Sequence, residues 1–586
     1  MQKNNIKEAT TDNPLKIALE KCKAAFKITF VFAFFINLLM LITPLYSLQV
    51  LDRVIGSSNL ETLLMLSIII AFIYFIYTLL QIARSFTLIK VGEWLDNTLS
   101  PVIFAHSISA SATKMNPASS QMLRDFQTLK TFLTSTGINT LFDAPWSIVY
   151  IIVIFMIHPY IGYVTIFGAV IIVSLAFFNA VATNKTLGEA TEFSIKGMGQ
   201  AEIANRNAEA VEAMGMIQNV KRNWAKFNEA SLAKQSIASY RNGIISNFSR
   251  FVRNLMQMAV TGVGAYVVVS SHGADMTTGG MIASSIIVGK ALAPFDNAIV
   301  MWKSISSASK SYKSINESFA KHIEREQAMP IPYVDGHLTV ENVYYSFPTP
   351  PNMIQQAMPR QILKGISFAV QPGEILAVIG HSASGKSTLA KLIVGVWKAT
   401  SGSVRLDGGD VFTWNRENFG EHVGYLPQGI ELFSGSIKEN IARMSDEINP
   451  EKVIDAAKMC GAHEMILRLP EGYDSDIGSG GSNLSGGQRQ RIGLARAFYG
   501  SPKLVILDEP NANLDEAGEM ALAAALAEAR KRKISVVVIS HRPSILSEVD
   551  KIMVIQDGAV ASFGTKDEIH GRIQMLKNGM IHINEK

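Results

Sequence analysis

Cysteine is nearly absent, since the 586-residue chain holds only Cys22 and Cys460, in parts of the sequence that we assign to different domains. Two such distant thiols exclude a disulfide framework and a cysteine-based zinc site. We therefore expect both thiols to be reduced, as cytoplasmic redox conditions favour.

Charge is also scarce. Asp, Glu, Lys and Arg make up 18% of the residues, against 48% hydrophobic residues, whereas a soluble domain carries about 25% charged residues. The apolar residues concentrate before about residue 300, which disfavours a single compact soluble domain. The net charge of +5 is small for this length and forms no basic stripe, so we expect no nucleic-acid partner.

Long apolar runs dominate the first half. A membrane-spanning helix needs about 20 mostly apolar residues, and six runs qualify: 26–50, 60–82, 141–157, 160–181, 251–271 and 281–302. Buried helices of a large soluble protein are the weaker alternative, because the runs are long and nearly uncharged. The first 25 residues are polar, and no small-residue cleavage pattern follows them, so we expect the first run to be retained as a membrane helix.

The distribution of basic residues predicts the orientation. Residues 84–140 and 182–250 hold fourteen Lys or Arg, whereas the short loops on the other side hold only Arg53. The positive-inside rule therefore places both termini and both long loops in the cytoplasm. Residues 186–240 are rich in Ala, Glu, Lys and Met and contain no Pro, so this loop is predicted to continue the membrane helices.

A domain boundary is predicted near residue 330. Residues 303–330 are polar and compatible with a helix, and then Pro330, Pro332 and Gly336 interrupt the pattern. Strand-like runs alternate with helical stretches beyond this point, which indicates an α/β domain with a largely parallel sheet.

The strongest motif is GHSASGKS at residues 380–387, directly after the apolar strand EILAVI. It matches the phosphate-binding P-loop, in which glycines let backbone N–H groups surround an anion at a helix N-terminus. Lys386 is predicted to reach the β- and γ-phosphates, and Ser387 to ligate Mg²⁺. The predicted nucleotide contacts in this loop are Gly380, Ser384, Gly385, Lys386, Ser387 and Thr388.

A second apolar strand, KLVILDEP, ends in two carboxylates. Asp508 suits the coordination shell of Mg²⁺, and Glu509 is predicted to activate the attacking water. Alone this pattern is weak, but it follows the P-loop by about 120 residues, which makes it informative.

Further motifs around the P-loop resemble the ABC ATPase superfamily. Residues 484–488 read LSGGQ, the signature of that family, and four other family elements stand in the family's order. These are Phe347 in YYSFP, Gln428 in YLPQ, Asp515 in NANLD and His541 in VVVISHRP. Each alone has an ordinary structural explanation, but together with the P-loop they identify the segment 336–570 as resembling an ABC ATPase.

The resemblance implies a mechanism. Two ATPase domains would sandwich ATP and Mg²⁺, so that Ser485, Gly486, Gly487 and Gln488 of one copy face the nucleotide held by Lys386 of the other. It implies that Glu509, His541 and Gln428 act in hydrolysis, that Ser387, Gln428 and Asp508 bind the metal, and that Phe347 stacks on adenine. The family often has Tyr at the position of Phe347, but stacking needs only the aromatic face.

The combined resemblance implies the fold and the domain limits. We expect an all-α transmembrane domain with six helices, of the ABC exporter type, fused to an α/β P-loop nucleotide-binding domain. The predicted limits are a cytoplasmic tail 1–25, a transmembrane domain 26–318, a linker 319–335, an ATPase domain 336–570 and a tail 571–586. One chain carries half of a transporter, so a homodimer is implied.

Finer similarity points to the ATPases of bacterial type I secretion. LYSLQVLDRVI, FDAPW, VGKALAPFDNAI and NLSGGQRQRIGLARAFYG resemble the branch that exports metalloproteases and haem-binding proteins. That branch lacks an N-terminal peptidase-like domain. The resemblance implies export of an unfolded polypeptide with a C-terminal signal, from the bacterial inner membrane and among its lipids. It also implies a periplasmic adaptor and an outer-membrane channel as partners. A lipid, drug or peptide exporter that works without an adaptor is the alternative.

Two features of the membrane half have no assigned role. Lys290 and Asp296 interrupt the sixth run, and charges at membrane depth usually face a cavity or each other. We expect them to line the transport path, with a structural ion pair or snorkelling as the alternatives. Residues 142–146, FDAPW, stand at a helix entry, where a role in substrate entry and a structural role are equally plausible.

Overall fold

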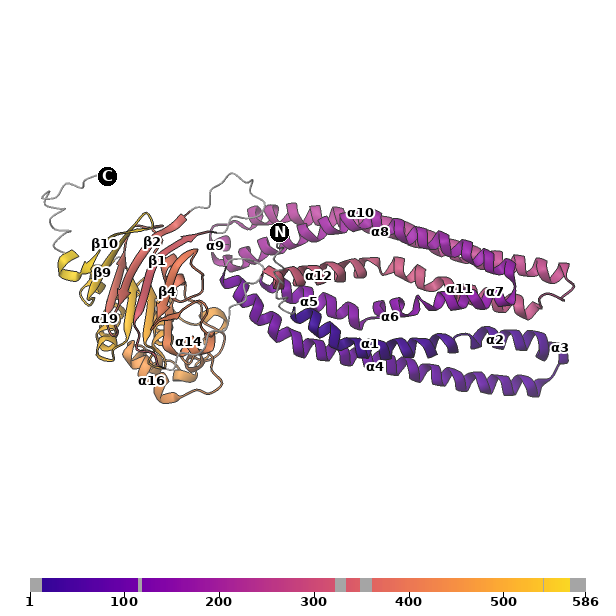
Figure 1. Cartoon of the computed structure of the whole chain (residues 1–586), viewed down its shortest axis with the longest axis horizontal. Coiled ribbons are helices and arrows are strands. Elements are labelled where there is room, and N and C mark those ends of the chain that lie inside the picture. The colour runs from indigo at the N-terminus through magenta and orange to yellow at the C-terminus, as the bar shows by residue number, and fades with distance from the viewer. Residues whose placement is uncertain (1–12, 114–118, 322–332, 348–360, 541, 570–586) are drawn as a thin grey trace, which may run out of the picture. The chain divides into compact units, whose positions relative to one another are not determined.

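The computed structural model describes residues 13–113, 119–321, 333–347, 361–540 and 542–569. The chain divides into two compact units, Met1–His322 and Ile323–Lys586. The first unit is built of helices and the second of strands and helices (Figure 1).

The first unit consists of long helices joined by short breaks. In chain order these are α1 (Pro14–Leu39), α2 (Ile42–Gln49), the π-helical turn η1 (Val50–Val54), α3 (Ile55–Ser57), α4 (Leu60–Ala112), α5 (Ser119–Thr134), α6 (Thr136–Asp143), α7 (Trp146–Ile157), α8 (Pro159–Arg206), α9 (Ala208–Ala213), α10 (Ile217–Ser270), α11 (Thr278–Val300) and α12 (Trp302–Lys321).

Five helical segments of the described residues are long and apolar enough to span a membrane, and a sixth is formed by the bent pair α6 and α7. The first of the five combines α1 to α3. The bend of 41° in the pair falls at Ala144 and Pro145, because proline has no N–H to continue the helical ladder. The six apolar runs of the sequence thus correspond to these segments.

The helix α1 begins at Pro14, well before the apolar run that starts at Phe26. Asn13 caps it by accepting a hydrogen bond from the N–H of Leu15 at 3.0 Å, and Pro14 suits the first helical position. Leu15 and Cys22 are buried against side chains of α4, α5 and α12. This polar first part is therefore helical because of tertiary packing, which the apolar run alone does not reveal.

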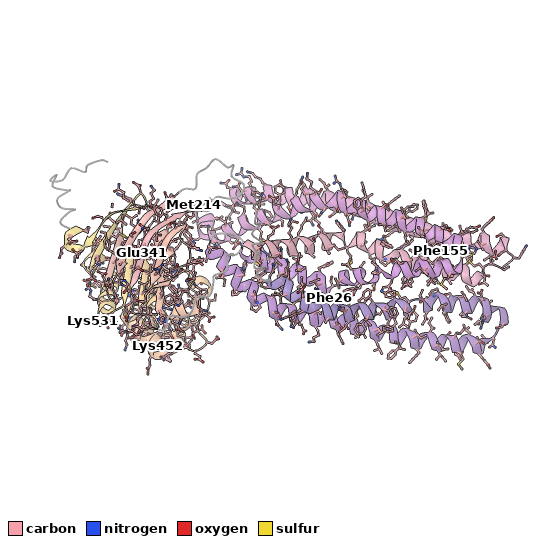
Figure 2. All side chains as sticks on the ribbon, viewed as in Figure 1. Phe26, Phe155, Met214, Glu341, Lys452 and Lys531 are labelled. Carbon is pink, nitrogen blue, oxygen red and sulfur yellow. The ribbon has the colours of Figure 1, made fainter. Side chains whose placement is uncertain are left out.

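The predicted helical continuation of the loop 186–240 is confirmed. The helices α8 and α10 run side by side for most of their length, and a short connection containing α9 joins them (Figure 1). Figure 2 labels Met214 at this connection and Phe155 near the opposite end of the same bundle.

Small residues let the membrane helices approach closely. A Cβ atom on Gly168 of α8 would lie 2.6 Å from Met256 of α10, and one on Gly162 would lie 2.6 Å from the ring of Phe155. Side chains larger than hydrogen do not fit at these two contacts. Close helix contact through small residues is the usual packing mode within membranes.

The two charges of α11 have different environments. Asp296 is buried and forms an ion pair with Arg253 of α10 at 3.0 Å. Lys290 has no carboxylate within 4 Å among the described residues and faces a cavity. For Asp296 the structure thus shows the structural ion pair, because a buried carboxylate needs a neutralising partner. The expectation that Asp296 lines a path is not supported by this contact.

The segment FDAPW takes part in a polar network. Asp143 accepts hydrogen bonds from Arg84 of α4 at 3.1 Å and from Asn37 of α1 at 3.0 Å. The hydroxyl of Tyr150 on α7 donates to Asn37. The network joins α1, α4, α6 and α7 at the bend, and this gives the segment a structural role.

The second unit contains two sheets. The antiparallel sheet has the order β2-β1-β4-β5, with β1 (Leu338–Ser346), β2 (Gln361–Val370), β4 (Ser401–Leu406) and β5 (Gly409–Asp410). The other sheet has the order β10-β9-β3-β8-β7-β6, with β3 (Ile375–Ile379), β6 (Val423–Leu426), β7 (Leu504–Asp508), β8 (Ser535–Ile539), β9 (Lys551–Gln556) and β10 (Ala559–Thr565). Its strands are parallel except for β10, which confirms the predicted largely parallel sheet.

The second unit also contains helices. They are α13 (Lys386–Ile393), α14 (Arg416–His422), α15 (Ile437–Ile441), α16 (Pro450–Met459), α17 (His463–Leu467), α18 (Gly486–Phe498), α19 (Glu516–Lys531) and α20 (Pro543–Leu546), with single turns η2 (Gly472–Asp474) and η3 (Ser479–Gly481). Of these, α13, α14, α18 and α19 contact strands of the parallel sheet. Along β7, Val505 and Leu507 enter one core, whereas Leu504 and Ile506 enter the other. Burial on both faces explains why this strand is an unbroken apolar run.

The burial of the Cys460 thiol predicts low reactivity in the folded chain. Cys460 is fully buried after α16, and burial raises the pKa of its thiol. Because the thiolate is the reactive form, N-ethylmaleimide should leave Cys460 unmodified in the folded chain and modify it after denaturation, as read by peptide mass spectrometry. A Lys458→Cys variant supplies an exposed thiol as the control. Modification of Cys460 at the rate of that control would contradict the buried position.

Candidate active site

Parallel strands end at one edge of the sheet, and candidate residues stand at the ends of three of them. Gly380 follows β3, Gln428 follows β6 and Asp508 ends β7. The carboxyl ends of parallel strands are where open α/β sheets bind ligands. The topology thus gathers side chains that lie far apart in the sequence.

The loop between β3 and α13 requires glycine at two positions. A Cβ atom on Gly380 would lie 2.2 Å from the carbonyl oxygen of Ile555. Gly385 has a φ of 103° and a Cβ there would lie 2.6 Å from Leu363. The loop therefore keeps its tight path only with these glycines, and it leads directly into the N-terminus of α13 at Lys386. Ser384 is buried within the loop.

Lys386 is held against the loop. Its Nζ donates to the carbonyl oxygens of Gly380 at 2.7 Å and of His381 at 2.8 Å. Its side chain is buried, and desolvation lowers its pKa, while Glu509 and Asp508 act in the opposite direction. The ammonium of Lys386 is thus held against the glycine-rich loop 380–387, which resembles a phosphate-binding loop.

Two carboxylates at the end of β7 have different partners. Asp508 is buried and accepts a hydrogen bond from the hydroxyl of Ser387 at 3.2 Å. Desolvation raises the pKa of Asp508, and the Ser387 hydrogen bond partly offsets this. Glu509 accepts a hydrogen bond from Nε2 of Gln428 at 2.9 Å. Ser387, Asp508, Glu509 and Gln428 therefore form one polar group beside the loop, with Thr388 next along α13.

Glu509 has a strained backbone. Its φ of 52° lies in the left-handed region, which costs energy for a residue with a side chain. Its N–H donates to the carbonyl oxygen of Ile539 at 3.0 Å and so continues the β7–β8 pairing by one residue. The strained turn directs the Glu509 side chain differently from that of Asp508.

A second group surrounds the N-terminus of α18. Ser485 caps this helix through a reciprocal pair with Gln488, at 3.2 Å from the N–H of Gln488 to the Ser485 hydroxyl and 2.8 Å in return. Gly486 and Gly487 form the first turn, where a Cβ on Gly487 would lie 3.1 Å from the carbonyl oxygen of Asn513. The N–H groups of Gly486 and Gly487 have no helical acceptor at this position, and the helix dipole favours negative charge there.

Asp515 belongs to this second group. It caps α19 by accepting from the N–H of Gly518 at 2.9 Å and pairs with Arg491 of α18 at 2.7 Å. These two contacts, the backbone hydrogen bond first, lower the pKa of Asp515. Within the described parts of the chain, no hydrogen bond joins Ser485 to Lys386.

Phe347 stands at the end of β1 beside other aromatic rings. Its ring meets those of Tyr345 and Trp397 edge-on, each at 5.8 Å between centroids, and Phe347 remains 39% exposed. Tyr345 and Trp397 stack on each other at 5.2 Å. Tyr345 and Trp397 thus hold the Phe347 ring in place while part of that ring stays accessible to solvent.

The sequence motifs therefore lie in two groups and one aromatic platform, while His541 lies outside the described residues. Sequence reasoning missed Arg491 and Trp397. Arg491 stands in the RQR stretch that follows LSGGQ, so its nearness to the signature was a usable signal. Trp397 gave none, because its stacking depends on the pairing of distant segments.

A phosphate-binding loop with a carboxylate pair, on an α/β unit that follows a membrane-spanning helical unit, defines an ABC transporter. The chain belongs to this family: residues 363–512 match the ABC transporter model, and residues 26–290 match the ABC transporter transmembrane region. It is a multi-pass membrane protein whose ATPase domain drives transport, and the predicted exporter fold fused to an ABC ATPase is confirmed.

Similar proteins narrow the class. The chain is 36% identical to the type I secretion system ATP-binding protein PrsD of Rhizobium meliloti, over 95% of this chain and 94% of that protein. It is 26% identical to the alpha-hemolysin translocation ATP-binding protein HlyB of Escherichia coli, over 94% of this chain and 77% of that protein. A bacterial Atm1-family ABC exporter with ATP bound shares the fold, with a TM-score of 0.78, 20% identity and coverage of 96% and 99%.

Proposed function

We propose that this chain is the inner-membrane ATPase and permease of a type I secretion system, which exports an unfolded polypeptide bearing a C-terminal signal. The similarity to PrsD carries this proposal, because it extends over 95% of the chain and thus includes the membrane unit as well as the ATPase. An ATPase resemblance alone would not distinguish cargo classes.

In this proposal the loop 380–387 holds the phosphates of ATP. Gly380 and Gly385 give the backbone its tight path, Ser384 and Thr388 flank the anion, and Lys386 supplies a positive charge. Phe347 offers its exposed ring to the adenine.

The same site suits Mg²⁺. Ser387, Asp508 and the amide oxygen of Gln428 are hard oxygen donors, and Ser387 and Asp508 already lie 3.2 Å apart. The remaining ligands of the ion would come from phosphates and water. Bound there, the ion would neutralise charge on the transferred phosphoryl group.

Glu509 is proposed to orient and deprotonate the attacking water, with Gln428 beside it. The hydrogen bond from Gln428 to Glu509 supports this pairing, since it fixes the carboxylate at the edge of the loop. His541, which follows β8 in the sequence, is proposed to contact the same reacting group.

The second group is proposed to act in a homodimer. The proposed anion-binding helix end is formed by Ser485, Gly486, Gly487 and Gln488. Among the residues that the structure describes, no hydrogen bond joins it to the Lys386 loop of its own chain. Asp515 is tied to that helix through Arg491. In the dimer this end would close on the nucleotide held by Lys386 of the partner subunit, and ATP would thereby couple the two copies.

The same proposal gives the membrane orientation, the partner proteins and the segment limits of the chain. Both termini lie in the cytoplasm, as the basic loops indicate. Membrane lipids surround the helices, and a periplasmic adaptor and an outer-membrane channel complete the exporter. The limits 1–25, 26–318, 319–335, 336–570 and 571–586 are proposed for its segments.

Co-purification tests the proposal. The tagged full chain, cross-linked mildly in its own membranes and identified by mass spectrometry, should bring down an adaptor and a secreted polypeptide. A Lys386→Ala chain, prepared in parallel, shows whether capture depends on ATP loading. Capture of neither protein, together with ATPase activity stimulated by lipid or drug, would favour an exporter that works without an adaptor.

A further inference from the structure

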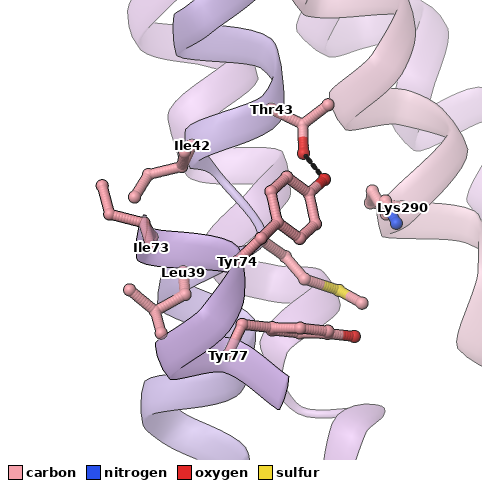
Figure 3. A pocket seen from close by; sticks show the side chains of 8 residues that line it. Leu39, Ile42, Thr43, Ile73, Tyr74, Tyr77 and Lys290 are labelled. Atoms are coloured by element: carbon pink, nitrogen blue, oxygen red, sulfur yellow. Dashed lines mark hydrogen bonds between the residues drawn. The ribbon is translucent and has the colours of Figure 1, made fainter. Parts of the chain in front are cut away.

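A mainly apolar cavity with four polar side chains in its lining lies within the membrane unit. It has a volume of about 70 Å³ and is lined by the break between α1 and α2, by α4 and by Lys290 of α11. Its lining residues are Leu39, Met40, Ile42, Thr43, Ile73, Tyr74, Tyr77 and Lys290. Figure 3 shows Lys290 across from the rings of Tyr74 and Tyr77. A cavity needs only about 10–15 Å³ of such free volume to hold one water.

The lining of the cavity includes hydrogen-bond donors. Tyr77 Oη accepts from Nε2 of Gln81 at 2.9 Å, and Gln81 accepts in turn from Arg84 at 2.9 Å. Tyr77 Oη accepts the hydrogen bond from Gln81 through a lone pair, so its own proton remains available to a further acceptor. Thr43 and Tyr74 share a hydrogen bond of 2.6 Å, which fixes the opposite wall of the cavity (Figure 3).

The charge of Lys290 is not neutralised within the described chain. Lys290 stands near the middle of α11, so its ammonium lies at membrane depth, where a charge needs a partner. Asp296 on the same helix has one, Arg253 at 3.0 Å, whereas no carboxylate of the described residues lies within 4 Å of Lys290. The lining residues also include no acidic side chain.

We infer that this cavity binds carboxylates of the exported polypeptide, through Lys290 and the hydroxyl of Tyr77, as the chain passes. The inference rests on the proposed polypeptide export. A carboxylate accepts hydrogen bonds only, which matches the donors of an ammonium and of a phenol hydroxyl. Lipid headgroups also carry anions, but they lie at the bilayer surface, about 15 Å from the middle of the hydrocarbon core. The central position of Lys290 therefore favours the polypeptide.

Binding of two matched peptides tests the inference. One is a flexible, fluorescent peptide of Gly, Ser and Glu, and the other has Gln in place of every Glu; both have amidated C-termini. Their anisotropy is measured with the full chain in phosphatidylcholine nanodiscs. The wild-type chain should bind the Glu peptide about tenfold more tightly than the Gln peptide, as for one charge-assisted contact. Lys290→Gln should abolish this preference, and Lys290→Arg should retain most of it.

Controls separate the cavity from general charge effects. Lys221→Gln removes an exposed lysine from α10 and should leave the preference unchanged. Tyr77→Phe keeps the ring and removes only the donor, so it should weaken the Glu peptide alone. Equal binding of both peptides by the wild-type chain, or an undiminished preference in Lys290→Gln, overturns the carboxylate site and leaves the export proposal standing.

Lipid is tested as the competing occupant. Nanodiscs containing phosphatidylglycerol should not change the peptide preference beyond its dependence on ionic strength. If that lipid removes the preference in the wild-type chain and has no effect on Lys290→Gln, the cavity holds a headgroup and the inference is wrong. If the wild-type chain binds neither peptide, the site is likewise refuted, whereas export itself is judged by co-purification.

Discussion

Replacing Glu509 with Gln should lower ATP turnover by about 10²- to 10⁴-fold, because an amide cannot accept the proton of the attacking water. Nucleotide binding should persist, since Lys386, Ser387 and Asp508 remain in place. The variant should therefore accumulate as a nucleotide-bound dimer. Phosphate release measures the first effect, and size-exclusion chromatography with nucleotide analysis measures the second.

The matched control is Glu516→Gln, which neutralises an exposed carboxylate in the first turn of α19. Its turnover should equal that of the wild-type chain. Fast hydrolysis by Glu509→Gln would remove Glu509 from the reaction and would require another base at the edge of β7.

Two inactive chains should restore one working site when combined. Lys386→Ala removes the cation of the loop, and Ser485→Arg blocks the N-terminus of α18. If each site joins Lys386 of one copy to Ser485 of the other, a mixed dimer of the two variants contains one intact pair. Nucleotide occlusion should then be absent from each variant dimer and reach half of the wild-type level in the mixed dimer, as measured with radiolabelled ATP on complexes purified through two different tags.

The control is a dimer of one wild-type chain and one chain that carries both Lys386→Ala and Ser485→Arg. In that dimer each site lacks one member, so occlusion should be lost although one chain is unaltered. If each chain instead builds its own site, this dimer should reach half of the wild-type level and the mixed dimer should show no occlusion, and the proposed dimer would fall.

The sequence predicts the phosphate loop and the helical content of the membrane unit well, for a local reason. The positions of Gly380 and Gly385 are dictated by contacts that exclude a Cβ atom, so the loop geometry is visible as residue type. Apolar runs likewise report membrane helices directly, because their length must match the bilayer.

Contacts between distant segments could not be predicted in this way. The pair Arg253–Asp296 joins α10 to α11, and without it Asp296 looks like a residue of a transport path. The early start of α1 depends on burial of Leu15 against other helices. In both cases the residue that makes the contact lies far away in the sequence, and no local spacing pattern identifies it.

The length of α10 has a mechanical consequence. Its 54 residues form one continuous rod of about 81 Å, at a rise of about 1.5 Å per residue, and α8 packs along it. Such a doubled rod works as a lever arm: a tilt of about 5° about one end moves the other by about 7 Å, from the same rise. A passage for an extended polypeptide can thus open through angular changes of only a few degrees, with the packing inside each arm preserved.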